Sequence, residues 1–307
     1  MNDIMDQSDQ PTRCGFIAVI GAPNAGKSTL VNQLIGAKVS IVSPKVQTTR
    51  TRVTGILAED NYQAIFVDTP GIFKGAKRRL EKAMVDVAWR QAAETDRLLL
   101  VIDVSKGKLS EHDRTVIEQL AQQKATPMLA LNKVDEARHE KMLEIAAAVN
   151  AQLDIQETFM VSALTGDGVE DLKNAVVDRL PEGPWLYPED QISDLPSRML
   201  AAEVTREKLF LQLHQELPYN LTVETEAFEV QKNGDLKVNQ VIFVTRDSHK
   251  AMVLGKGGSK IKNVGAESRK DLAELFDRKV HLFLFVKVRE NWLNDPERYR
   301  EMGLDLG

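Results

Sequence analysis

The sequence predicts an α/β domain with a mostly parallel sheet and helices on both faces, followed by a smaller α+β domain. Two patterns lead to this fold class. From residue 15 to residue 180, apolar runs alternate with segments of helical periodicity, which is typical of a parallel sheet covered by helices. Beyond residue 196 the order changes to αββααβ. The 307 residues are enough for two domains of about 100 to 200 residues each.

The first domain contains six predicted strands, and most of them are separated by helix-forming segments. The strands lie at residues 16–20, 62–67, 97–104, 127–131 and 157–161, with an edge strand at 52–58. Because strands and helices alternate along the chain, these segments form the layered sheet of an α/β domain.

A proline-rich stretch at residues 181–196 separates the two domains. Four prolines in its sixteen residues prevent a long helix and predict a semi-rigid connector. The second domain then has a helix at 197–214, strands at 221–231 and 237–246, two helices, and a last strand at 279–289. Asn233-Gly234, between the first two strands, is a typical hairpin turn.

The domain organisation follows from these boundaries. We expect a flexible lead-in at 1–14, the first domain at 15–180, the connector at 181–196, the second domain at 197–292 and a tail at 293–307.

Composition excludes several classes of protein. Hydrophobic residues make up 43% of the chain and charged residues 28%, which excludes a disordered, collagen-like or coiled-coil chain. The single cysteine, Cys14, cannot form an intrachain disulfide, and the five histidines show no metal-ligand spacing. No signal peptide or run of 18 apolar residues is present, so we expect a cytoplasmic protein.

A phosphate-binding motif follows the first strand directly and precedes a helix-forming run. It is a complete G-x-x-x-x-G-K-S pattern, made of Gly21, Ala22, Pro23, Asn24, Ala25, Gly26, Lys27 and Ser28. Gly21 and Gly26 allow backbone N–H groups to surround phosphates, and the helix N-terminus adds partial positive charge. Lys27 is expected to hold the β- and γ-phosphates, and Ser28 to bind Mg²⁺.

A second motif identifies the base as guanine. Asn132, Lys133, Val134 and Asp135 end an apolar strand. The Asp135 carboxylate accepts hydrogen bonds from N1–H and the 2-amino group of guanine, which adenine does not present in that arrangement. Ser162, Ala163 and Leu164 follow the next strand, where the Ala163 N–H would reach guanine O6.

A third motif comprises Asp68, Thr69, Pro70 and Gly71, followed by Ile72. Asp68 would hold Mg²⁺ through a water, and the Gly71 N–H would meet the γ-phosphate, so that loss of this phosphate releases the loop. The polar stretch at 43–50 would supply a further Mg²⁺ ligand, and the sequence leaves Thr48 and Thr49 both open.

This ordered series resembles the signature motifs of the translation-factor-like GTPases. The resemblance implies a GTPase that binds GTP, GDP and Mg²⁺, and we assign catalytic roles to Asn24, Lys27, Thr49 and Gly71. Ile72 stands where Ras-like proteins have the glutamine that orients the attacking water, so water positioning must come from elsewhere. Relatives with Pro-Asn in the phosphate loop use K⁺ as a substitute charge; Asn24 either serves that role or stabilises the loop turn.

The second domain contains a G-x-x-G pattern between its two later helices. A glycine pair at such a junction lets a nucleic-acid backbone approach closely, with lysines contacting phosphates. The predicted RNA-binding residues are Gly255, Lys256, Gly257, Gly258, Lys260, Ile261 and Lys262, over an apolar floor of Val253, Leu254, Ile261 and Val264.

Charge separates the two halves of the chain. Residues 246–289 contain eleven Lys and Arg against five Asp and Glu, whereas residues 1–194 contain 22 against 28. The net charge of −5 therefore hides an acidic first domain and a basic core in the second.

The second half resembles a KH domain in which strands precede the helix pair, and its pairing with a GTPase resembles a bacterial family of ribosome-assembly factors. The resemblance implies binding to the 3′ end of 16S ribosomal RNA, a role in biogenesis of the small (30S) ribosomal subunit and peripheral association with the inner membrane. No coiled-coil pattern indicates an oligomer, so we expect a monomer. The alternative is a GTPase that regulates a membrane or protein partner in cell-cycle control, with the basic patch on anionic lipid.

Overall fold

The computed structural model describes residues 11–45, 48–50, 52–72, 79–213, 217–290 and 292. These residues form two compact units, each of which is described by itself. The first unit contains residues 11–40, 52–72 and 85–194; the second contains 41–45, 48–50, 79–84 and the residues from 195 onward. The tail expected at 293–307 and residues 1–10 of the lead-in lie outside the described residues.

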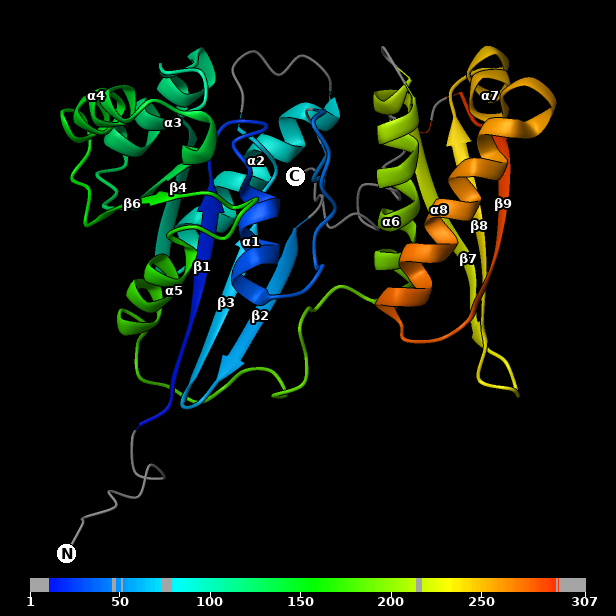
Figure 1. Cartoon of the computed structure of the whole chain (residues 1–307), viewed down its shortest axis with the longest axis horizontal. Helices are drawn as coiled ribbons and strands as arrows, with labels where there is room; N and C mark the ends of the chain where they lie inside the picture. Colours follow the sequence, from blue (N-terminus) through cyan, green and yellow to red (C-terminus); the bar gives the residue numbers. More distant parts are fainter. Residues whose placement is uncertain are drawn as a thin grey trace, which may run out of the picture. The chain divides into compact units, whose positions relative to one another are not determined.

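The first unit is built on a six-stranded sheet of order β2-β3-β1-β4-β5-β6 (Figure 1). Its strands are β1 Arg13–Ile20, β2 Val53–Glu59, β3 Tyr62–Asp68, β4 Arg97–Asp103, β5 Met128–Asn132 and β6 Thr158–Val161. Only the edge strand β2 is antiparallel, paired with β3; the other neighbours are parallel. The six predicted strands and the mostly parallel sheet are confirmed.

Helices cover both faces of this sheet. They are α1 Lys27–Ile35, α2 Arg79–Glu94, α3 Glu111–Gln122, α4 His139–Asn150 and α5 Val169–Asp178. Side chains of α1 and α5, such as Leu30 and Leu172, pack in one apolar cluster, whereas α2, α3 and α4 pack in the other. The carboxyl ends of the parallel strands lie at one edge of the sheet. The predicted motifs follow these ends, so they meet at that edge.

The first strand begins three residues earlier than the sequence predicts. Arg13 pairs with Tyr62 of β3, and Thr12 exchanges hydrogen bonds with Gly183. The polar composition of residues 11–14 suggested a flexible lead-in, but pairing with β3 and with the chain beyond α5 orders them.

The proline-rich stretch is hydrogen-bonded to the first unit along its length. The Gln63 side chain accepts from the N–H groups of Leu186 and Tyr187 and donates to the Tyr187 carbonyl. Farther on, the Ile56 N–H donates to the Ile192 carbonyl, so the stretch covers part of the β2 edge. It therefore belongs to the first unit up to Asp194.

The second unit has a three-stranded sheet of order β7-β8-β9. Its elements are α6 Ser197–Gln212, β7 Leu221–Val230, β8 Leu236–Val244, α7 Asp247–Leu254, α8 Ser259–Leu275 and β9 Val280–Val288. β7 and β8 are antiparallel and joined by the predicted hairpin, in which Gly234 has φ +86°, while β8 and β9 are parallel. The αββααβ order is confirmed.

The second unit has its own core. Leu209 and Phe210 of α6 pack with Ile242 of β8 and Val264 of α8, and all four are buried. A second cluster joins Val204 of α6 to the other end of the sheet. Within the described residues, the helices are too short or too polar to cross a membrane.

Candidate functional site

The phosphate motif forms the turn between β1 and α1. Gly26, which precedes α1, has φ +92°, and a Cβ atom there would lie 2.2 Å from the Asn132 Nδ2 atom. Gly71 of the third motif also has no room for a side chain, since a Cβ there would lie 2.8 Å from the Pro23 Cα atom. Both glycines are therefore needed for neighbouring motifs to approach this loop, in addition to their predicted role around phosphates.

Lys27 is buried at the start of α1. Its Nζ donates to the carbonyls of Gly21, at 3.2 Å, and Ala22, at 3.0 Å. Burial lowers the pKa of Lys27 to about 8, although Asp68 and Asp113 act in the opposite direction. The ammonium group is held inside the loop, where it can exchange its carbonyl partners for phosphate oxygens.

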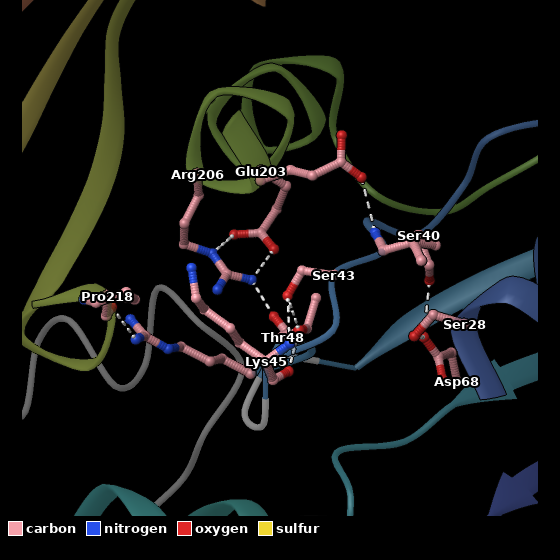
Figure 2. Close-up of polar contacts among 12 residues, drawn as sticks. Ser28, Ser40, Ser43, Lys45, Thr48, Asp68, Glu203, Arg206 and Pro218 are labelled. Atoms are coloured by element: carbon pink, nitrogen blue, oxygen red, sulfur yellow. Dashed lines mark hydrogen bonds and ion pairs between the residues drawn. The ribbon is translucent and has the colours of Figure 1, made fainter. Parts of the chain in front are cut away.

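Two predicted Mg²⁺ ligands lie together beside this loop. The Ser28 hydroxyl donates to Asp68 Oδ2 at 2.7 Å (Figure 2). Ser40, which belongs to none of the predicted motifs, donates to the same oxygen at 2.9 Å. Asn32 fixes Ser40 by accepting its N–H and donating to its carbonyl. A serine in the loop after α1 carries no recognisable motif, so only the folded chain identifies it.

The third motif is joined to the phosphate loop through its backbone. The Ile72 N–H donates to the Gly21 carbonyl at 3.1 Å, and the Thr69 hydroxyl donates to the Val19 carbonyl at 2.8 Å. The Ile72 side chain is 1% exposed and packs in the core with Ala18 and Ala88. Ile72 therefore has no side chain available to orient water, and any contact it makes with nucleotide is through the backbone.

Asn132 connects the base motif to the other two loops. Its Nδ2 donates to the Ala25 carbonyl at 2.8 Å, and its Oδ1 accepts the Ala163 N–H at 3.0 Å. For guanine O6 to accept the Ala163 N–H, it would have to share this N–H with Asn132 Oδ1 or take the place of Asn132 Oδ1 as its acceptor. Asp135 and Leu164 are exposed at the same edge of the sheet, where the base would lie between loops.

Lys133 adopts a left-handed backbone, with φ +69°, and its ammonium group pairs with Asp103 at the end of β4. Burial raises the pKa of Asp103, but hydrogen bonds from Lys133 and Ser105 outweigh it and hold the pKa below its usual value. Asp103 was not predicted from the sequence, although its position beside Asn132 in the β4–β5 register could have indicated it.

The remaining predicted residues of the GTP site are placed as follows. Asn24 is exposed and has φ +64°, a conformation that asparagine tolerates better than most residues, which favours the loop-turn role. Thr48 and Thr49 belong to the second unit, where the Thr48 hydroxyl donates to the Lys45 carbonyl at 2.7 Å. The choice between these threonines as Mg²⁺ ligand stays a prediction.

The glycine loop of the second unit joins α7 to α8. A Cβ at Gly255 would meet the Lys260 Cβ at 2.7 Å, so this glycine is required by packing. Gly257 and Gly258 also have positive φ, of +59° and +76°, but a Cβ at either would have no neighbour within 4 Å. No described residue fills the space above these two glycines, which leaves their backbone open to a ligand.

Lysines surround this open backbone. Lys256 and Lys262 are exposed and Lys260 is half-buried, and the ion pairs of the described residues include none of them. Ile261 is half-buried beside them. The loop therefore presents positive charge without carboxylate partners, which suits a phosphate backbone.

The predicted apolar floor is wrong in part. Val253 and Val264 are both 0% exposed and belong to the core of the second unit, so neither can contact a base. Their closeness to the glycine loop in the sequence does not show which way their side chains face. Leu254 and Ile261 are half-buried and remain available.

Among the described residues, no group of three or more His, Cys, Asp or Glu side chains is placed to hold a metal ion.

Comparison with known proteins places the chain in one family. A family model described as a 50S ribosome-binding GTPase matches residues 16–133, and a KH domain model matches residues 216–293. GTPase Era of Sinorhizobium medicae (strain WSM419) is 58% identical over 296 residues, 96% of this chain and 95% of the relative. The chain belongs to the Era family of GTPases. GTPase Era of Agrobacterium fabrum is 57% identical, over 96% of this chain and 93% of its own length.

Solved structures of Era agree with this fold over nearly the whole chain. A variant of Aquifex aeolicus Era bound to GDP·AlF4⁻ has a TM-score of 0.89 and 34% identity, covering 96% of this chain and all of that one. Era in complex with MgGDPNP and nucleotides 1506–1542 of 16S ribosomal RNA has the same TM-score and coverage, with 35% identity. The predicted fold class and the predicted GTPase activity are confirmed.

Replacing Asp135 with asparagine should relax the guanine selectivity of this Era-family GTPase. The amide offers a donor where the carboxylate accepts two hydrogen bonds, and loss of bonds to a charged group costs about 1.5 to 3 kcal/mol each. The Kd for GDP, measured by fluorescence titration, should rise at least about tenfold. Glu136→Gln, at the exposed neighbouring position, should leave the Kd unchanged; normal guanine preference in Asp135→Asn would overturn the base-reading role.

Burial of Lys27 predicts a pH dependence of nucleotide binding. With a pKa of about 8 before phosphate binds, Lys27 loses its proton as pH rises, and only the charged form attracts phosphate. Between pH 7 and pH 8.5 the affinity for GDP should fall about fourfold, with proton uptake on binding that calorimetry in two buffers detects. Guanosine, which lacks phosphates, serves as the control; a GDP affinity that stays constant over this range contradicts the assignment.

Proposed function

We propose that this GTPase is a nucleotide-controlled RNA-binding protein that recognises the 3′ end of 16S ribosomal RNA and assists biogenesis of the 30S subunit. GTP occupies the loops at the carboxyl edge of the first sheet, and the glycine loop between α7 and α8 takes single-stranded RNA. Bound GTP keeps the RNA-binding state in place, and hydrolysis ends it.

The observation that carries the RNA proposal is the open backbone of the glycine loop. Gly257 and Gly258 have space for a ligand where any side chain would intrude, and Lys256 and Lys260 lie beside them. A phosphate backbone needs close main-chain approach and positive charge, and this loop supplies both. The likeness to Era bound to a 16S ribosomal RNA fragment names the class of RNA.

The residues of the first unit fit a magnesium ion. Ser28 and Asp68 offer a hydroxyl and a carboxylate whose oxygens lie 2.7 Å apart, and hard oxygen donors are the ligands that Mg²⁺ prefers. Ser28 would hold the ion directly, Asp68 through a water, and Thr48 or Thr49 would complete the set. When bound, the ion neutralises charge on the β- and γ-phosphates.

The chain's own residues supply the other parts of the GTP site. Lys27 exchanges the Gly21 and Ala22 carbonyls for phosphate oxygens, and Asn132 keeps the base loop against the phosphate loop. Because Ile72 is buried, the attacking water takes its orientation from other groups. We place the protein in the cytoplasm as a monomer, with peripheral association with the inner membrane.

Single-stranded oligonucleotides test the RNA proposal. Wild-type protein should bind the 16S 3′-end sequence in preference to a scrambled oligonucleotide of equal length and charge, measured by fluorescence anisotropy. Gly257→Asp should weaken this binding at least tenfold, because a carboxylate would stand where the phosphates approach, and should leave GDP affinity intact.

Gly234→Asp is the matched control for this experiment. Gly234 lies in the β7–β8 turn of the same unit and also combines positive φ with open space. Its substitution should leave RNA affinity unchanged. Binding that ignores sequence and follows charge alone would overturn the RNA proposal and support an anionic lipid surface as the target.

The K⁺ role of Asn24 is tested by comparing salts. If Asn24 helps to hold K⁺ beside the phosphates, GTP hydrolysis should be faster in KCl than in NaCl at equal ionic strength, and Asn24→Ala should remove that difference. Equal rates in both salts for the wild type would leave Asn24 with its turn role alone.

A further inference from the structure

Ser40 lies in the loop after α1 and belongs to the first unit. The helix ends at Gly36, whose φ of +72° lets the chain turn back toward α1. Val39 is 1% exposed and packs in the apolar cluster that contains Leu34 of α1. The chain therefore enters Ser40 from a buried position in the core of the first unit.

Asn32 of α1 fixes the backbone of Ser40. Its Oδ1 atom accepts the N–H groups of Val39 and Ser40, both at 2.9 Å, and its Nδ2 atom donates to the Ser40 carbonyl at 2.7 Å. One amide side chain thus pairs with both the donor and the acceptor of the Ser40 main chain. Because the backbone is fixed in this way, the Ser40 side chain leaves it in a fixed direction.

That direction is toward Asp68 (Figure 2). The Ser40 hydroxyl donates to Asp68 Oδ2 at 2.9 Å, and the two residues are 2% and 0% exposed. Asp68 is the last residue of β3, where its backbone pairs with Val19 of β1 and Val53 of β2. A buried carboxylate needs hydrogen-bond donors, and Ser40 supplies one from a turn that α1 holds in place.

Ser28 and Ser40 donate to the same carboxylate oxygen but differ in what else they do. Ser28 is the proposed Mg²⁺ ligand, and its hydroxyl lies 2.7 Å from Asp68 Oδ2. A serine hydroxyl has one proton and two lone pairs, so Ser28 can donate to Asp68 and offer a lone pair to a metal ion. Ser40 belongs to none of the nucleotide motifs, and its bond to Asp68 does not depend on how Ser28 is used.

We infer that Ser40, held by Asn32, is a positioning residue for the Mg²⁺ site, because its hydroxyl fixes the orientation of the Asp68 carboxylate. This role rests on the proposed function of Ser28 and Asp68 in holding the ion. Ser40 acts through Asp68 and needs no contact with the nucleotide. Loss of its hydroxyl removes one donor from a buried carboxylate and one constraint on its rotation, so the effect falls on metal affinity and not on nucleotide affinity.

Ser40→Ala in the full, GDP-loaded chain tests this role. Mn²⁺ serves as the probe, because it suits the same oxygen ligands as Mg²⁺ and the electron paramagnetic resonance of free Mn²⁺ measures its binding directly. The Kd for Mn²⁺ should rise about three- to tenfold, the size expected for loss of one hydrogen bond. The Kd for GDP with a chelator present should equal that of the wild type, whereas a general structural defect would raise both constants.

Ser110→Ala is the matched control. The Ser110 hydroxyl donates to Asp113 Oδ2 at 2.6 Å, and Asp113 is also buried, with 4% exposed. Both residues lie in the first unit at the start of α3 and belong to none of the predicted motifs. Loss of this serine–aspartate bond should leave the Kd for Mn²⁺ unchanged. An equal rise in Ser110→Ala and Ser40→Ala would contradict the specific role of Ser40.

Asn32→Ala tests the connection from α1. It should raise the Kd for Mn²⁺ in the same direction as Ser40→Ala, because the Ser40 backbone loses its partner. Since Asn32 acts through Ser40, the double variant should match Ser40→Ala alone. Effects that multiply in the double variant would overturn the connection from Asn32 through Ser40 to Asp68.

The wild-type titration separates the role of Ser40 from the proposed Mg²⁺ site. If the GDP-loaded wild type binds no Mn²⁺, the proposed site itself fails. If the wild type binds Mn²⁺ and Ser40→Ala binds it equally well, the role of Ser40 is rejected and the proposed site stands. Weaker Mn²⁺ binding by Ser40→Ala with unchanged GDP affinity supports both.

Discussion

The GTP site depends on the two hydrogen bonds of the Asn132 side chain. One goes to the phosphate loop at Ala25 and the other comes from the Ala163 N–H, so a single amide fixes the loops after β1, β5 and β6. Gly26 is required because a Cβ there would clash with this amide. The parallel sheet brings the three loops to one edge, and Asn132 determines how closely they approach. The spacing between Lys27 of the phosphate loop and Asp135 of the base motif follows from these two bonds.

The second unit uses glycine differently. Gly255 is required by packing, as Gly26 is, but Gly257 and Gly258 border open space. Glycine adopts their positive φ at little cost, so the open space beside them, and not backbone strain, is what points to a ligand.

The sequence predicts much of this, and the gaps have physical causes. Strand positions follow from apolar runs, and the GTP motifs have fixed spacing because backbone geometry around phosphates allows little variation. Val253 and Val264 do not form the predicted floor, because closeness to the glycine loop in the sequence does not show which side of a helix is buried. Ser40 and Asp103 contact the site residues Asp68 and Lys133 from distant segments, and no local pattern marks them. The order of residues 11–14 likewise comes from pairing with β3 and not from their composition.

The central claim is that nucleotide state controls RNA binding. It is tested most directly by measuring the Kd of the 16S 3′-end oligonucleotide with a nonhydrolysable GTP analogue and again with GDP, at one salt concentration. Coupling between two sites commonly changes affinity by about 5- to 150-fold. The account predicts binding at least fivefold tighter with the GTP analogue, and by reciprocity an equal gain in analogue affinity when RNA is present. Equal RNA affinity in the two nucleotide states would contradict it.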